Sequence, residues 1–328
     1  MACFASFLLM GHTLLCKSIK VGTVKKYLLA VKDYFINHNQ WDPCIVKHGT
    51  TAPVLTSVYK EGQRWESMPN RQEPITMEIM RFLISQASTS HQDSPEAAIA
   101  DWCITGSQSG FRCSEWAQPH SRKSLPLSAT VTKNVDGSAT AFLAEDFILL
   151  NKHKRPLVFS LSLDHTKVFY CSTKWRYQKN GDNGQIITYA RNDEDPEMCY
   201  ISAILRILTR ATRLAVKPSS PIAVAMVKRK KRKFPSFITS TLVTMYFQAA
   251  ARQVHRITLQ KDLDRFSSHS IRVWACVLLH THGKSPDYIK LRLRWRSDSY
   301  KDYLRDVSML AVEHADVIHQ AVTTLNAS

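Results

Sequence analysis

Two clusters of side chains near the end of the sequence could act on a phosphate group. His269 and Arg272 are three residues apart, so they share one face at the start of a helix, where free backbone N–H groups already favour an anion. Further on, Tyr300 and Tyr303 fall on an apolar stripe with Leu304. Spacing alone fits a half-buried packing position for either tyrosine, and it also allows one of them to act as a nucleophile.

Local signals predict the helices that must position these residues. Serines before an apolar period favour helix starts, glycine favours a stop, and proline favours the first position of a new helix. The expected signals are, in chain order, Ser267 or Ser268, Gly283, Ser285 with Pro286, and Ser297 or Asp298. Further starts are expected at Thr23, Thr76, Ser94, and Thr239 or Ser240. A further helix is expected with an apolar face formed by Ile201, Ile204, Leu205 and Leu208. This arrangement leaves Arg206, Arg210 and Arg213 available to solvent or phosphate.

A third polar cluster lies in the segment Gly110-Phe111-Arg112-Cys113-Ser114-Glu115. Arg112 and Glu115 are three residues apart, and such a pair usually forms an ion pair on a helix surface. Taken alone, this cluster is a weak functional signal.

The middle of the chain changes from a helical period to strand-like alternation. Strands are expected within Leu157 to Leu163, Val168 to Cys171, Thr173 to Gln178 and Ile186 to Tyr189, which are rich in β-branched and aromatic residues. The glycines and asparagines at 180–184 predict a hairpin turn. Lys179 lies in that turn, and a lysine there is most often solvated.

The charge of the chain points to a polyanionic partner. The 328 residues carry 44 Lys and Arg against 27 Asp and Glu, a net charge of +17. Nucleic acid is the leading partner and an anionic membrane surface the weaker one. The longest basic run is Lys228, Arg229, Lys230, Lys231, Arg232 and Lys233. It fits an exposed DNA-contacting loop and equally a nuclear-import signal.

Several other classes of protein are disfavoured. The eight cysteines show no Cys-x-x-Cys spacing, which argues against a zinc site, and their scatter suits a reducing compartment better than a disulfide framework. No His-Glu-x-x-His occurs. We therefore expect neither a metal nor a cofactor. No run of about 20 apolar residues occurs, so we expect no membrane span. Met1 to Leu15 is interpreted as a helix of the first domain, since it lacks the basic leader of a signal peptide.

Taken together, these motifs resemble those of the tyrosine recombinase (phage integrase) family, and most closely the recombinases of eukaryotic mobile elements. The family's Gly-x-Arg-x-Ser-Glu appears around Arg112, its His-x-x-Arg at His269 to Arg272, and its nucleophile helix at Trp295 to Arg305. Trp295 stands where many members of the family carry a second histidine. It lies eight residues before Tyr303, whereas the usual spacing in the family is nine residues.

The resemblance implies a role for each residue. Tyr303 would be the nucleophile, with Tyr300 as the rival, and Arg112 and Arg272 would bind the phosphate. His269 would manage the tyrosine proton, and Trp295 would contact the scissile phosphate. Lys179, with Lys174 in reserve, would protonate the leaving group. Glu115 would be a structural partner of Arg112.

The resemblance also implies the architecture. We expect a mainly α fold with a small antiparallel β-sheet (α+β). A helical core-binding domain would span 1–68, a linker 69–74 and the catalytic integrase domain 75–328. Lys25 and Lys26 would contact DNA from the first domain, whose first helix is expected to be shortened. The final helices, Met309 to Leu325, would pack on a neighbouring protomer.

The resemblance implies metal-independent cleavage and rejoining of double-stranded DNA through a 3′-phosphotyrosyl intermediate, by a homo-oligomer that is tetrameric at synapsis. We expect a protein of a mobile element, located in the nucleus if eukaryotic and otherwise in the cytoplasm or nucleoid. Three alternatives remain: a catalytically silent, transposon-derived DNA-binding protein, a type IB topoisomerase-like enzyme, and a basic helical nucleic-acid-binding protein without an active site.

Overall fold

The computed structural model describes residues 1–12, 19–39, 41–46, 49–66, 71–178, 181–229 and 232–304. The chain divides into two compact units, Met1–Asn70 and Arg71–Ser328. Each unit has a hydrophobic core of its own.

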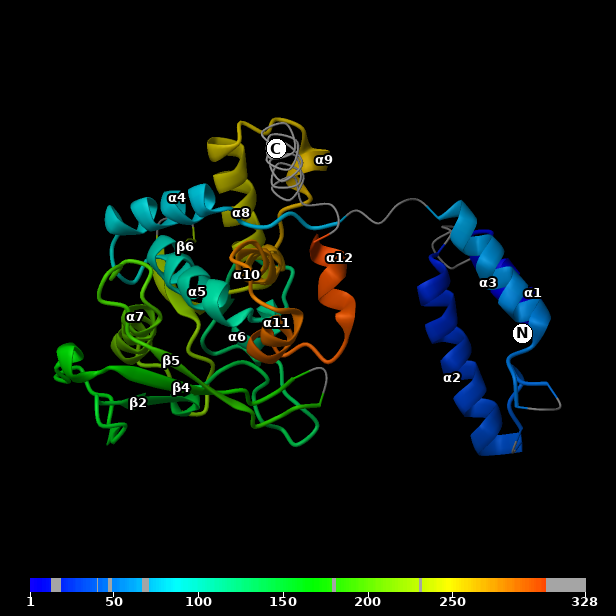
Figure 1. The fold of residues 1–328 in the computed structure, drawn as a ribbon, viewed down its shortest axis with the longest axis horizontal. Helices are drawn as coiled ribbons and strands as arrows, with labels where there is room; N and C mark the ends of the chain where they lie inside the picture. Colours follow the sequence, from blue (N-terminus) through cyan, green and yellow to red (C-terminus); the bar gives the residue numbers. More distant parts are fainter. Residues whose placement is uncertain are drawn as a thin grey trace, which may run out of the picture. The chain divides into compact units, whose positions relative to one another are not determined.

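The first unit is helical (Figure 1). It contains α1 (Ala2–Leu9), α2 (Val21–Asn39) and α3 (Pro53–Trp65). Its buried residues come from all three helices and are Ala5, Leu8, Val24, Leu28 and Leu55. The expected start of α2 at Thr23 is wrong, because the helix begins two residues earlier and the backbone N–H of Thr23 already donates to the carbonyl of Lys20.

The helices of the second unit begin largely where capping chemistry predicts. The side chains of Thr76, Ser94, Thr239 and Ser285 each accept a hydrogen bond from a backbone N–H three residues later. The helices are α4 (Met77–Ser88), α5 (Pro95–Ser109), α6 (Cys113–Trp116), α7 (Tyr200–Arg213), α8 (Ser240–Val254), α9 (Gln260–Leu263), α10 (Ser270–Thr281), α11 (Pro286–Leu293) and α12 (Lys301–Leu304). Short 3₁₀ turns are η1 (Ala144–Asp146), η2 (His165–Lys167) and η3 (Asp298–Tyr300).

Two small antiparallel sheets complete the second unit, which confirms a mainly α fold of the α+β class. The first has the order β3–β2–β4–β5, from Pro156–Leu157, Phe147–Leu150, Tyr170–Lys174 and Ile186–Ala190. The second has the order β1–β7–β6, from Leu125–Pro126, Arg232–Phe237 and Val224–Arg229.

The expected hairpin is confirmed, because β4 and β5 pair antiparallel from Tyr170 opposite Ala190 to Lys174 opposite Ile186. A long strand at Leu157 to Leu163 is wrong, since only Pro156–Leu157 pairs. The described ends of the basic run pair in the β6–β7 hairpin, with Lys228 opposite Lys233 and Arg229 opposite Arg232, where side chains alternate across the strand and cationic residues can occupy exposed positions. Lys230 and Lys231 lie outside the described residues.

Close packing of α5 and α10 brings distant parts of the sequence together. A Cβ atom on Gly106, inside α5, would lie 2.7 Å from the side chain of Ile271 in α10, so only glycine permits this approach. α5 then ends at Gly110, which has φ +60°, the left-handed conformation that glycine favours at a helix end. Figure 1 shows α5, α10, α11 and α12 grouped in the second unit. This arrangement places the start of α6 beside the start of α10.

Candidate active site

A tyrosine and a histidine meet at the start of α10. Nε2 of His269 lies 2.9 Å from the hydroxyl oxygen of Tyr303, and their ring centroids are 5.4 Å apart. Tyr303 lies in α12, 34 residues later in the chain, so the contact depends on the way that α12 packs on α10. This geometry allows a proton to pass from the phenol to the imidazole.

The electrostatic environment keeps both groups neutral in the resting site. Burial, followed by the charges of Arg272 and Arg112, lowers the pKa of His269 from 6.5 to about 4. Burial raises the pKa of Tyr303 above 10, while the same two arginines oppose that shift. At neutral pH the pair is therefore an unprotonated imidazole beside a protonated phenol.

Arg272 acts electrostatically on both members of this pair and is 1% exposed. Its Nη1 donates to the carbonyl of Gly110, and its Nη2 donates to the carbonyl of Leu293 at 3.3 Å. Burial lowers the pKa of Arg272 to about 9, which still leaves the guanidinium charged at neutral pH. The site therefore holds a desolvated positive charge close to the tyrosine.

Arg112 is the N-cap residue of α6, and its side chain is 22% exposed. Nη1 of Arg112 lies 3.0 Å from Oε1 of Glu115, which is 3% exposed. The predicted ion pair between them is confirmed. Because Arg112 also acts electrostatically on His269, the structure brings the two arginine motifs to one place.

Trp295 completes the cluster. Its ring lies 4.2 Å from the guanidinium carbon of Arg272 and contacts the ring of Tyr303 edge to face at 5.3 Å. Nε1 of Trp295 is buried and has no hydrogen-bond partner among the residues that the structure describes. An indole N–H in that state is a donor available to an incoming acceptor.

The rival tyrosine occupies a different environment. Tyr300 is 2% exposed and belongs to a buried cluster with Ala275, Cys276, Ile289 and Leu293. A side chain in such a position serves packing. The structure thus places Tyr303, and not Tyr300, beside His269.

Lys179 lies outside the described residues, but the loop that carries it has a defined anchor. Within the β4–β5 connection, Oδ2 of Asp182 accepts a hydrogen bond from Nε of Arg296 at 2.9 Å. Arg296 follows Trp295 directly in the chain. The reserve residue, Lys174, is exposed at the end of β4.

The residues expected to contact DNA are exposed where their side chains are described. Lys25 and Lys26 lie on α2, and Nζ of Lys25 is 4.8 Å from the ring centroid of Tyr59. Lys228, Arg232 and Lys233 are exposed on the β6–β7 hairpin. The Arg229 side chain, Lys230, Lys231 and the segment Met309 to Leu325 lie outside the described residues.

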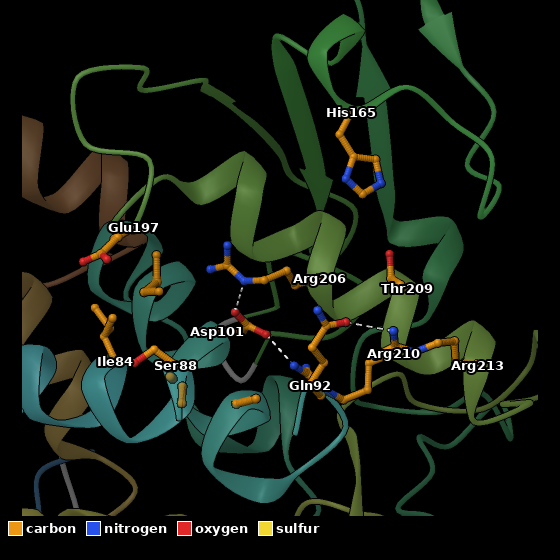
Figure 2. Close-up of a pocket in the computed structure, with 14 residues that line it drawn as sticks. Ile84, Ser88, Gln92, Asp101, His165, Glu197, Arg206, Thr209, Arg210 and Arg213 are labelled. Carbon is orange, nitrogen blue, oxygen red and sulfur yellow. Dashed lines mark hydrogen bonds and ion pairs between the residues drawn. The ribbon is translucent and has the colours of Figure 1, made fainter. Parts of the chain in front are cut away.

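The expectation that the arginines of α7 are available to phosphate is wrong for Arg210. Figure 2 shows Arg206 and Arg210 on either side of Asp101. All three residues line a cavity of about 430 Å³. Nη2 of Arg210 lies 2.6 Å from Oδ2 of Asp101, and both side chains are buried. Arg213 pairs with Asp93 at 2.5 Å. These ion pairs hold α7 against α5 and the turn before it.

One residue of the cluster was not singled out from the sequence. Arg294 is buried and forms an ion pair with Glu115 at 3.2 Å, across 179 positions. Its only sequence signal is its place in Arg294-Trp295-Arg296, which does not reveal a buried partner.

Within the described ranges, no group of three or more His, Cys, Asp or Glu side chains is arranged to hold a metal ion. Over the same residues, no helix combines the length and the apolar character required to cross a membrane.

No protein-family model matches the sequence, and no curated protein matches it. Solved structures do match. The Tn1549 transposon integrase in complex with transposon right-end DNA matches with a TM-score of 0.46 and 13% identity, covering 98% of this chain and 85% of that chain. A lambda integrase dimer bound to a core site matches with a TM-score of 0.37 and 13% identity, covering 88% of this chain and 81% of that one. Both of these structures are complexes of an integrase with DNA.

Proposed function

We propose that this protein is a tyrosine recombinase that cleaves and rejoins DNA strands through a 3′-phosphotyrosyl intermediate. The observation that carries the proposal is the 2.9 Å contact between Tyr303 and His269, with Arg272 and Arg112 close enough to shift both pKa values. A nucleophile, a base and two permanent positive charges in one place are the groups that phosphodiester cleavage requires.

In the proposed reaction, the hydroxyl oxygen of Tyr303 attacks the phosphorus in line with the 5′-oxygen. The Tyr303 O–P bond forms and the P–O5′ bond breaks. The phenolic proton moves to Nε2 of His269, whose basicity increases when a DNA phosphate offsets the charges of the arginines. A proton from Lys179 completes the departing 5′-hydroxyl. The reverse reaction with another 5′-hydroxyl rejoins the strand and conserves the bond energy.

The arginines stabilise the charge that builds on the non-bridging oxygens during this displacement. A guanidinium is planar, stays charged and matches the geometry of a phosphate. Removal of one such donor from an active site typically costs about 10²- to 10³-fold in rate. Because these charges come from side chains, the proposed reaction proceeds in the presence of a chelator.

The proposed substrate is double-stranded DNA at the ends of a mobile element that encodes the chain, and the proposed active form is a homo-oligomer that is tetrameric at synapsis. The net charge of +17 and the exposed cationic residues of α2 and the β6–β7 hairpin support binding to the DNA backbone.

The test is trapping of the covalent intermediate. The full chain is incubated in EDTA with end-labelled DNA from the sequences flanking its gene, nicked so that cleavage cannot be reversed. A denaturing gel then detects a protein–DNA adduct. We expect the adduct with wild type and with Tyr300→Phe, which keeps the buried ring, and its loss with Tyr303→Phe.

Loss of the adduct in Tyr300→Phe alone would transfer the nucleophile role to Tyr300. Salt-sensitive DNA binding without an adduct on any fragment would instead favour a protein that only binds DNA.

A further inference from the structure

Arg294 combines a strained backbone with a buried charge. It ends α11 in the left-handed conformation, with φ 59° and ψ 51°, which glycine adopts more readily than any other residue. Its side chain is 1% exposed. Glycine would suit the backbone at this position, so the guanidinium is what the residue contributes.

The guanidinium of Arg294 is directed at one carboxylate oxygen. Nη1 and Nη2 each lie 3.2 Å from Oε2 of Glu115, and Nη2 also donates to the carbonyl of Ser109 at 3.3 Å. The guanidinium carbon lies 3.9 Å from the ring centroid of Trp175, whose own Nε1 donates to Oε2 at 3.3 Å. These contacts fix the position of the Glu115 carboxylate.

Glu115 is shared between two arginines. Its Oε1 accepts from Nη1 of Arg112, and its Oε2 accepts from Arg294 and from the backbone N–H of Arg112 at 3.1 Å. In the part of the chain that the structure describes, this Nη1 bond is the one hydrogen bond that the guanidinium of Arg112 makes. Among the described residues, the other N–H groups of this guanidinium have no hydrogen-bond acceptor and are available to bind an anion.

The balance of charge explains why two arginines are needed. The cluster contains one carboxylate, that of Glu115, and three guanidinium groups, those of Arg112, Arg272 and Arg294. Without Arg294, the buried carboxylate would act mainly on Arg112 and would repel a DNA phosphate that approaches the same guanidinium. Buried charges interact strongly, because little water screens them.

We infer that Arg294 is a positioning residue that neutralises Glu115 and thereby leaves the charge of Arg112 available to a DNA phosphate. The inference rests on the proposed function, since it concerns the same phosphate. It predicts a specific compensation: once Arg294 is removed, neutralising Glu115 as well improves the site.

The test compares four proteins by single-turnover adduct formation on nicked DNA. They are wild type, Arg294→Gly, Glu115→Gln and the double variant, with Arg292→Ala as the matched control. Glycine at 294 relieves the left-handed backbone, so this variant loses the guanidinium without added strain. We expect Arg294→Gly to slow the reaction by about 10²-fold, on the scale of one lost electrostatic contact.

The double variant is expected to react about 10-fold faster than Arg294→Gly, because the opposing carboxylate is gone. If Arg294 served only to hold the structure together, the rates would follow the opposite order. The double variant would then react no faster than the slower of the two single variants. That order would overturn the inference, and so would an Arg294→Gly protein that reacts like wild type. Arg292→Ala should react like wild type.

A second readout needs no turnover. Inorganic phosphate should raise the thermal unfolding temperature of wild type and of the double variant more than that of Arg294→Gly, because a ligand that binds the native state stabilises it. If wild type forms no adduct but this pattern holds, the proposed function fails and the inference stands. If wild type forms the adduct but neither assay shows recovery in the double variant, the inference fails and the function stands. A wild type with neither response overturns both.

Discussion

Nε of Arg296 lies 2.9 Å from Oδ2 of Asp182, and this ion pair joins the β4–β5 connection to the residue that follows Trp295. Arg296 is exposed and Asp182 is partly exposed, so water screens their charges and the pair contributes little to the free energy of unfolding. Its importance lies in the loop that it anchors, because that loop carries Lys179.

The first prediction concerns that loop. Arg296→Ala is expected to slow strand cleavage about 10-fold, and Lys179→Ala about 10²-fold or more, because the leaving 5′-oxygen loses its proton donor. A substrate with sulfur in place of the 5′-bridging oxygen should restore both variants, since a thiol has a pKa of about 8.5 and leaves without an acid. Single-turnover cleavage of the two substrates provides the measurement.

Lys174→Ala is the control for that experiment and should cleave both substrates like wild type. If sulfur restores Lys174→Ala and not Lys179→Ala, the acid is Lys174.

The second prediction concerns acid stability. The pKa of His269 is lowered from 6.5 to about 4 in the folded protein, so between these values the unfolded chain binds a proton that the native site does not. Stability should therefore fall as pH decreases through this window. At pH 4.5 the loss from this residue is about 2–3 kcal/mol.

Urea denaturation at pH 7 and pH 4.5 measures this effect. The comparison with His269→Gln is decisive, because the carboxylates that titrate in the same window contribute equally to both proteins. Equal pH sensitivity of wild type and His269→Gln would contradict a depressed pKa for this histidine.

The third prediction concerns the indole of Trp295. Trp295→Phe keeps an aromatic ring over Arg272 but removes the buried N–H that lacks a partner among the described residues. We expect cleavage to slow about 10-fold, the effect of one lost hydrogen bond of about 1–1.5 kcal/mol to the phosphate. The free energy of unfolding should stay the same or increase.

Trp274→Phe is the matched control, because the Nε1 of Trp274 is also buried without a partner in the described part of the chain. Trp274 lies in α10, in the main hydrophobic core. Its substitution should leave the cleavage rate unchanged, whereas an equal loss in both variants would point to a general packing effect.

The fourth prediction concerns DNA affinity. Lys228 and Lys233 are directly opposite each other in the β6–β7 hairpin, and like charges in that position destabilise a pair of strands. The double variant Lys228→Ala/Lys233→Ala should therefore fold at least as well as wild type. If both lysines contact DNA phosphates, the logarithm of the association constant for DNA should fall less steeply with the logarithm of the salt concentration. The slope should be shallower by about 2.

Lys152→Ala/Lys261→Ala removes two other exposed lysines and controls for the overall change in net charge. If both double variants change the salt dependence of DNA affinity equally, the hairpin lysines contribute no more to DNA binding than other exposed lysines.

Features that depend on local chemistry can be predicted from the sequence alone. The capping hydroxyls of Thr76, Ser94 and Ser285 predicted three helix starts because the hydrogen bonds they accept are made within three residues. The alternation and turn residues predicted the β4–β5 hairpin for the same reason. The motifs around Arg112 and His269 also identified residues that the fold brings into one site.

Tertiary structure decided which of these side chains are buried and paired. Arg210 and Arg206 look alike in a helical period, yet Arg210 is buried against Asp101, 109 positions away. Tyr300 and Tyr303 share a stripe, but only the packing of η3 and α12 on α10 separates a core tyrosine from one beside His269. Arg294 meets Glu115 across 179 positions. Local periodicity carries no information about such partners, because they depend on which helices pack together.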